Sequence, residues 1–184
     1  NAYQTLISQY TDSELKAAAH QHLGDYFFEE RQNDEAIKHY KRVVELHEPD
    51  GKFYSQGLFG LAWSYYNKNQ VEQCQELFVR LLDWSEGRRL RTGDLDAGHE
   101  LAERYLALSF IAQTELDAAR MEADPTLNLA LVPERTASFF GAQTGRKFEA
   151  NVMVILAEEL KVDGRFNEAI SVLETVLTKW PNRA

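Results

Sequence analysis

Cysteine is scarce in this chain, which has only Cys74 among its 184 residues. A single cysteine cannot form an internal disulfide, so disulfide usage does not indicate a redox compartment. Cys74 lies in a helical pattern, at a position where a small buried residue is expected. Long apolar runs are also missing: none approaches the roughly 18 residues that span a bilayer, and no signal peptide opens the sequence. We therefore expect no direct membrane insertion by this fragment.

Positive charge is in deficit, because 20 Lys and Arg residues stand against 29 Asp and Glu residues, for a formal net charge of −9. An acidic chain repels the phosphate backbone of nucleic acids and anionic membrane surfaces, so we predict no nucleic-acid partner. The hydrophobic fraction of 44% and the charged fraction of 27% are those of an ordinary folded protein. A protein or a peptide is the expected partner.

Patterns typical of enzymes and metal sites are absent as well. The sequence shows no nucleophile with a base and no paired carboxylates in a cleft, so we predict no catalytic residues and no enzyme. Residues 141–148 contain two glycines, but their spacing is wrong for a phosphate loop and no strand precedes them. His20 and His22 fall on different faces of one helix, which disfavours a shared ion. We predict no metal and no cofactor.

What the sequence has instead is repetition. Four windows align without gaps, at residues 23–37, 61–75, 106–120 and 156–170. Each opens with Leu and a tiny residue, carries a large apolar residue three places later, and carries a small residue nine places after that. No stretch alternates apolar and polar residues long enough to indicate a strand. We therefore predict pairs of antiparallel helices joined by short polar turns, at residues 31–34, 68–70, 113–115 and 162–164.

The tiny residue of the first window is Gly24, in the middle of a predicted helix, where glycine costs roughly 1 kcal/mol relative to alanine. A small residue on each of two paired helices lets them approach closely, which explains the glycine. The windows begin 38, 45 and 50 residues apart, so extra residues are expected in loops. We predict insertions at 85–98 and 122–130, the second of which displaces a partner helix to about 133–143, with Pro133 as its first residue.

These residues resemble the tetratricopeptide repeat, a helix-turn-helix unit of 34 residues. Leu23, Gly24, Phe27, Ala36 and Tyr40 match its signature in the first unit. The resemblance implies an all-α, right-handed solenoid of antiparallel helix pairs, with about four repeats and a leading half-repeat. The expected boundaries are 1–14 for the second helix of a preceding repeat, then 17–50, 55–88, a divergent repeat at 97–144, and 150–183. We interpret this single repeat domain as a fragment of a longer protein.

The segments "LISQYTDSEL" and "LGDYFF" are similar to the repeat regions of bacterial cell-envelope and outer-membrane-associated tetratricopeptide repeat proteins. That resemblance implies a periplasmic or outer-membrane-associated location, with a cytoplasmic location as the alternative. Co-chaperones of this repeat family clamp a terminal carboxylate on their concave helices. Asp25 stands at a corresponding position here and would repel a carboxylate, which argues against that mode of recognition.

The first helix of each pair lines the concave face of such a solenoid, where extended peptides or helices are usually held. In the first unit, Gln21, His22, Asp25 and Glu29 are expected to face inward. The residues predicted to bind the partner are Phe28, Phe59, Trp63, Tyr66, Asn67, Arg104, Tyr105 and Leu108. Exposed aromatics flanked by polar groups form hot spots. In the alternative interpretation, an inserted loop or the displaced helix covers these aromatics.

The sequence therefore predicts a scaffold that binds a peptide or helical segment of a partner within a multi-protein assembly. Two alternatives remain open: an architectural spacer or self-association module, and a regulatory domain of a larger enzyme. A basic cluster at Arg88, Arg89 and Arg91 either holds an acidic partner segment or is a solvated loop.

Overall fold

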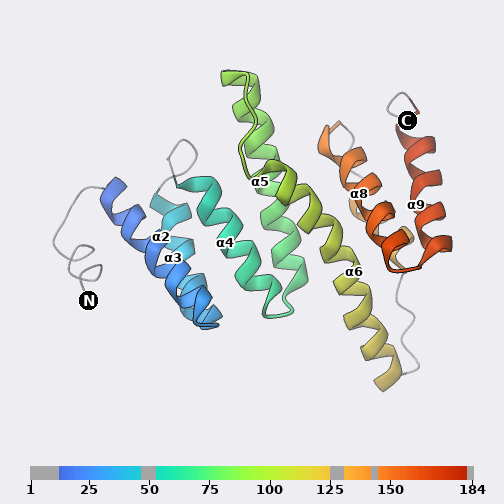
Figure 1. The fold of residues 1–184 in the computed structure, drawn as a ribbon, viewed down its shortest axis with the longest axis horizontal. Coiled ribbons are helices and arrows are strands. Elements are labelled where there is room, and N and C mark those ends of the chain that lie inside the picture. The colour runs from blue at the N-terminus through green and yellow to red at the C-terminus, as the bar shows by residue number, and fades with distance from the viewer. Residues whose placement is uncertain (1–12, 47–52, 125–130, 142–144, 182–184) are drawn as a thin grey trace. The chain divides into compact units, whose positions relative to one another are not determined.

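The computed structural model describes residues 13–46, 53–124, 131–141 and 145–181, and every regular element within these ranges is an α-helix (Figure 1). The all-α class expected from the sequence is confirmed. The helices are α2 (Ser13–Glu29), α3 (Asn33–Leu46), α4 (Tyr54–Tyr66), α5 (Val71–Thr92), α6 (His99–Ala123), α7 (Val132–Gly141), α8 (Phe148–Val162) and α9 (Phe166–Lys179). The chain divides into two compact units, Asn1–Ala102 and Glu103–Ala184.

In the first unit, neighbouring helices pack on one another, α2 on α3, α3 on α4 and α4 on α5 (Figure 1). The small residues of the repeated pattern lie in these contacts: Ala36, Ala62 and Cys74 are fully buried. Burial raises the pKa of the Cys74 thiol to about 12. The thiol therefore stays protonated, and Cys74 acts as a small apolar residue of the core.

The ring of Tyr40 on α3 occupies the space that two glycines leave open. A Cβ atom at Gly24 of α2 would lie 2.6 Å from Cε1 of Tyr40, and a Cβ atom at Gly60 of α4 would also overlap the ring. The Tyr40 hydroxyl donates a hydrogen bond to Oδ1 of Asp25 at 2.9 Å. Gly24 therefore provides room for a neighbouring aromatic ring, and Gly60, which the sequence pattern did not single out, does the same from the other side.

The turns between the helices of three pairs share one backbone conformation. Arg31, Asn69 and Gly164 have positive φ angles of 60°, 56° and 76°, and each stands eight residues after the Leu that opens its window. In each turn, the N–H of the next residue donates a hydrogen bond to the carbonyl five residues earlier, in the last turn of the helix. Gln32 donates to the Phe27 carbonyl at 2.8 Å, and Arg165 donates to the Leu160 carbonyl at 2.9 Å. This is the Schellman motif, which satisfies carbonyls at a helix end.

The predicted turn at residues 113–115 is wrong, because α6 runs through this segment as one helix of 25 residues. Thr114 stands at the position that has positive φ in the other three windows. A β-branched residue is strongly disfavoured in that conformation. Its Oγ1 instead donates to the Phe110 carbonyl at 3.0 Å, inside the continuing helix. The third window therefore supplies half of a long helix and no helix pair.

The insertion predicted at residues 85–98 is mostly helical. α5 continues to Thr92 and ends at Gly93, whose φ of 89° makes a left-handed C-cap. Glu, Arg and Leu make up five of the eight residues 85–92, and all three are good helix formers. The connection to α6 is therefore short, and the Arg88, Arg89 and Arg91 cluster belongs to a helix and not to a loop.

In the second unit, α7 takes the role of the displaced partner helix. It begins at Val132, one residue before the Pro133 expected at the helix start. Its Phe139 and Phe140 rings lie 5.1 and 5.9 Å from the Phe110 ring of α6, and its Arg135 pairs with the buried Asp117 of α6. The insertion at 122–130 lies outside the described residues from 125 onward. The individual repeat boundaries stay predictions.

We expect substitutions at the glycines around Tyr40 to destabilise the first unit. Gly24→Leu and Gly60→Ala should each lower the free energy of unfolding by about 1–3 kcal/mol, because a rigid ring leaves no room for the added carbons. Gly87→Ala in α5 is the matched control. Its Cβ would lie 3.6 Å from Arg91 Nη1, an ordinary contact, so the better helix propensity of alanine should stabilise the protein by roughly 0.5–1 kcal/mol. Urea denaturation of the three variants tests this, and an unchanged midpoint for Gly24→Leu would contradict the packing.

A histidine pair between α2 and α3 should make stability depend on pH. Nδ1 of His20 lies 2.9 Å from Nδ1 of His39. Burial, together with His39, Arg42 and Lys16, lowers the pKa of His20 from 6.5 to about 4, while Glu45 opposes the shift. The folded state thus binds fewer protons than the unfolded state. Above about pH 6.5, His20 is neutral in both states and does not reduce stability. As the pH falls from there toward about 4, protonation of His20 in the unfolded state lowers the free energy of unfolding.

Urea denaturation of the parent and of His20→Gln between pH 7.5 and 4.5 measures this contribution. The loss of stability on acidification should be smaller in His20→Gln, since glutamine does not titrate. Carboxylates also titrate in this range, so the difference between the two proteins is the relevant quantity. Parallel curves would rule out His20 as a source of the pH dependence.

Candidate functional site

The first unit carries a cavity of about 870 Å³ between α2, α4 and the connection from α5 to α6. Its walls are largely aromatic, with polar groups from α2 and from the α5–α6 connection. The lining residues are Gln21, His22, Asp25, Phe28, Tyr40, Phe53, Ser55, Gln56, Phe59, Gly60, Trp63, Leu81, Asp96, Ala97, Gly98 and Leu101. A concave, mostly apolar site with a few polar groups is the usual form of a ligand-binding pocket.

α2 contributes Gln21, Asp25 and Phe28, which lie on one helix face at four-residue and three-residue spacing. Nε2 of Gln21 donates to Oδ1 of Asp25 at 2.9 Å, and the Tyr40 hydroxyl donates to the same oxygen at 2.9 Å. Burial and the nearby Asp25 raise the pKa of Tyr40, so its hydroxyl stays a donor. The Asp25 carboxylate is thereby fixed at the cavity wall.

α4 contributes the main aromatic surface. Phe59 and Trp63 lie one helical turn apart and are both partly buried. The Phe59 ring meets the ring of Phe78 edge to face at 5.7 Å, and the Trp63 ring meets that of Tyr66 at 5.4 Å. Edge-to-face pairs of this kind fix ring orientation. The two aromatic side chains therefore present a preorganised wall to the cavity.

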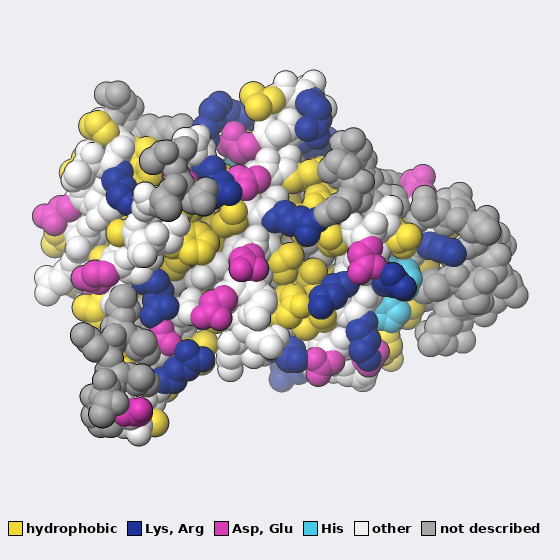
Figure 2. Space-filling view, turned by 180° about the vertical axis from the view of Figure 1, so that it is seen from behind, with side chains coloured by type: hydrophobic (Ala, Val, Ile, Leu, Met, Phe, Trp, Pro, Cys, Tyr) yellow, Lys and Arg dark blue, Asp and Glu magenta, His cyan; other side chains and the backbone are white. Residues whose placement is uncertain are grey.

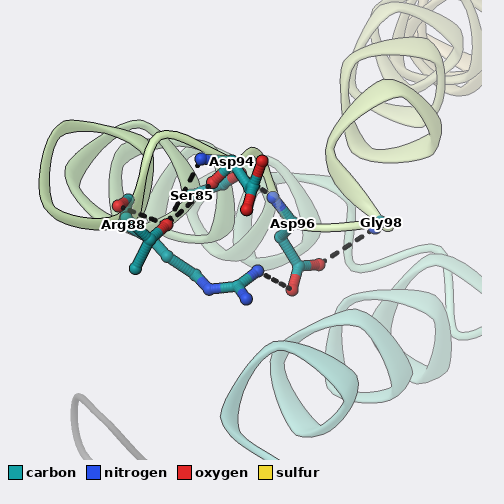
Figure 3. Close-up of polar contacts among 6 residues, drawn as sticks. Ser85, Arg88, Asp94, Asp96 and Gly98 are labelled. Carbon is teal, nitrogen blue, oxygen red and sulfur yellow. Dashed lines mark hydrogen bonds and ion pairs between the residues drawn. The ribbon is translucent and has the colours of Figure 1, made fainter.

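Asp96 closes the third side of the cavity and is held by a local network (Figure 3). Its backbone N–H donates to Ser85 Oγ at 3.0 Å, and its Oδ1 accepts the Gly98 N–H at 2.9 Å. Nη1 of Arg88 on α5 lies 3.8 Å from its Oδ2. The Gly98 contact is an Asx-type turn that leads into α6. The network orders the short connection at the point where it borders the cavity.

The charged side chains among the described lining residues are the carboxylates of Asp25 and Asp96, with no Lys or Arg in that set. Figure 2 shows the molecule from behind the view of Figure 1, and there Lys and Arg side chains are spread among hydrophobic and acidic ones. Arg88 borders the lining, because its Nη1 lies 3.8 Å from Oδ2 of Asp96, but it is not itself a lining residue. The electrostatic character of this lining is acidic and aromatic.

The structure brings together part of the predicted partner-binding set. Phe28, Phe59 and Trp63 line the cavity. Tyr66 contacts Trp63, and Asn67 is an exposed residue that caps α4 with its backbone N–H. The other predicted residues, Arg104, Tyr105 and Leu108, belong to the second unit, where Nε of Arg104 donates to Oε1 of Glu159 at 2.9 Å. Their role in binding stays a prediction.

Sequence reasoning placed Gln21, His22 and Asp25 on the inward face but missed other lining residues. Gln56 stands three residues before Phe59, so helical periodicity could have found it. Phe53, Asp96 and Gly98 lie outside the helices or at their ends. Their positions depend on where α5 ends and how the chain turns, for which the repeat pattern carried no signal.

Within the described ranges, no group of three or more His, Cys, Asp or Glu side chains is arranged to hold a metal ion. Among the helices that the structure describes, none is long and apolar enough to cross a bilayer.

Comparison with known proteins relates the helix pairs of this chain to a known type of repeat. Residues 17–48 match the family model described as tetratricopeptide repeat. These residues contain most of α2 and all of α3, and with them the Gly24–Tyr40 contact. No curated protein matches the chain by sequence.

Two solved structures of nearly identical TPR-like repeats, from a Podosopora anserina protein named after kinesin light chain, share the fold. One of them, a variant with a single substitution, aligns over 95% of this chain and 80% of its own, with a TM-score of 0.55 and 16% identity. The other aligns over 98% of this chain and 84% of its own, with a TM-score of 0.56 and 16% identity. The fold is therefore that of the TPR-like repeat solenoids. Such repeats generally mediate protein–protein interaction and are typically not catalytic.

Proposed function

We propose that this chain is a protein-interaction scaffold that binds a segment of a partner protein in the cavity of the first unit, as part of a multi-protein assembly. The observation that carries the proposal is the aromatic wall of Phe28, Phe59 and Trp63 beside the fixed carboxylate of Asp25. Large, rigid aromatic side chains in a concave site are the usual anchors of protein interfaces. The cavity is large enough for side chains of an extended segment or of one helix face.

We further propose that this assembly belongs to the bacterial cell envelope, as the resemblance of the segments "LISQYTDSEL" and "LGDYFF" implies. Most of the first of these segments lies outside the described residues. Fractionation of the native cells, followed by immunodetection of the protein, would test it. Recovery in the cytoplasmic fraction would overturn it.

Trp63→Ala should weaken partner binding without unfolding the protein. Loss of a true anchor typically costs about 2 kcal/mol or more, which is roughly thirtyfold in affinity. Tyr26→Ala is the matched control, because Tyr26 is an exposed aromatic residue of α2 (53% exposed) that does not line the cavity. The test is a pull-down with parent and both variants as bait, followed by titration of the captured partner and thermal melts.

The expected result is loss of the same partner with Trp63→Ala and its retention with Tyr26→Ala, at nearly unchanged melting temperatures. Equal capture by parent and Trp63→Ala would remove the cavity as the binding site. A large drop in melting temperature would assign Trp63 to the core.

A second candidate function, self-association, is favoured by the outer face of α9. Phe166, Ile170, Leu173 and Leu177 recur at spacings of four, three and four residues and are 59%, 55%, 41% and 55% exposed. This spacing places them in one stripe along the helix. Burying such a stripe against a second copy would remove apolar surface from water.

Ile170→Glu should abolish self-association if this candidate is correct. Light scattering across protein concentration should show the parent forming a defined oligomer and the variant remaining monomeric, because a charge in the stripe cannot be buried unpaired. Leu90→Glu is the control, since Leu90 of α5 is 79% exposed and lies outside the stripe. A monomeric parent at all concentrations would exclude self-association through α9.

A further inference from the structure

Two hydrogen-bond acceptors at the cavity wall point to the chemistry of the occupant. Oε1 of Gln21 is buried and has no hydrogen-bond partner among the described residues, although Gln21 lines the cavity. The two hydrogen bonds to Asp25, from Gln21 and from Tyr40, both end on Oδ1, which leaves Oδ2 to accept another donor. A buried acceptor without a donor costs free energy, so the site favours a ligand that supplies N–H groups.

The orientation of the Gln21 amide follows from its neighbour. Its Nε2 donates to the Asp25 carboxylate at 2.9 Å. Exchange of the amide oxygen and nitrogen would place two acceptors against each other. The unpartnered atom is therefore the oxygen, and the two groups together form an acceptor pair with one negative charge.

The surroundings of this acceptor pair suit a cation on an apolar stem. Phe28, Phe59 and Trp63 line the same cavity, and the described lining includes no Lys or Arg. Its second carboxylate, Asp96, already lies 3.8 Å from Arg88, so Asp25 is the carboxylate that suits an added cation. Aromatic faces attract cations, and a guanidinium stacks on them more readily than an ammonium. A guanidinium also presents several N–H donors in one plane, which suits a carboxylate oxygen and an amide oxygen side by side.

We propose that the cavity receives an arginine side chain of the partner segment, with its guanidinium on Asp25 and Gln21 and its methylene stem along Phe28, Phe59 and Trp63. This inference rests on the proposed scaffold function and adds the identity of the anchoring residue. The net charge of −9 also favours a basic partner segment.

The probe is a displayed library of random heptapeptides selected on the full chain, with the best binder then synthesised in matched forms. Selected peptides whose binding depends on Trp63 should share an arginine. Replacement of that arginine by citrulline, which has the same shape without the charge, should weaken binding about 10–100-fold. Lysine at the same position should bind at an intermediate level, and norleucine, which has neither the charge nor the N–H donors, should bind more weakly than citrulline.

On the protein, Asp25→Asn should reproduce the citrulline loss, because asparagine keeps Oδ1 as an acceptor for Tyr40 and Gln21 but removes the charge. Glu76→Gln removes an exposed carboxylate of α5 outside the cavity and should leave binding unchanged. Thermal melts confirm that both variants are folded. Citrulline should also cancel the effect of Asp25→Asn, as expected for two groups in direct contact.

Peptides that bind through Trp63 but share an acidic or purely apolar anchor would overturn the arginine assignment and leave the scaffold proposal standing. The same holds if citrulline and arginine bind equally. If no selected peptide depends on Trp63, the scaffold proposal for this cavity fails, and the arginine assignment fails with it.

Discussion

The contact between the Tyr40 ring and the two glycines that flank it joins the packing of the first unit to its cavity. The ring fills the space left by Gly24 and Gly60, and its hydroxyl holds the Asp25 carboxylate at the cavity wall. Helices α2, α3 and α4 are thus brought to their spacing by the same side chain that orients a polar group of the site. The glycines reduce helix propensity, and the buried ring with its hydrogen bond offsets that cost.

Much of the fold could be predicted from the sequence because the repeated windows encode packing and turns at fixed spacing. The helix pairs α2–α3, α4–α5 and α8–α9 follow the pattern. The third window failed for a local reason: Thr114 stands where Arg31, Asn69 and Gly164 adopt positive φ. Apolar periodicity does not report on that requirement, so the pattern alone could not distinguish a turn from a continuing helix. Backbone conformation at one residue therefore decided whether the window formed one helix or two.

The cavity was predictable to the extent that it is made from helix faces. Gln21, Asp25, Phe28, Phe59 and Trp63 follow from helical spacing once the inward face is chosen. The Asp96 side was not predictable, because the helix propensity of residues 85–92 extends α5, and the turn after Gly93 then sets where Asp96 falls. The Gln21 oxygen that lacks a donor among the described residues has no signal in sequence either, since it depends on which of two amide atoms meets Asp25.

In the proposed binding mode, the shared Asp25 carboxylate would also couple binding to the core. Oδ1 already accepts from Tyr40 and Gln21, so a donor arriving at Oδ2 adds to a network whose other end lies between α2 and α4. Hydrogen bonds in such chains strengthen one another at low dielectric. A cationic occupant would thus favour the arrangement in which Tyr40 is seated between its glycines. The core fixes the Asp25 carboxylate in place, and by reciprocity the proposed occupant would stabilise that part of the core.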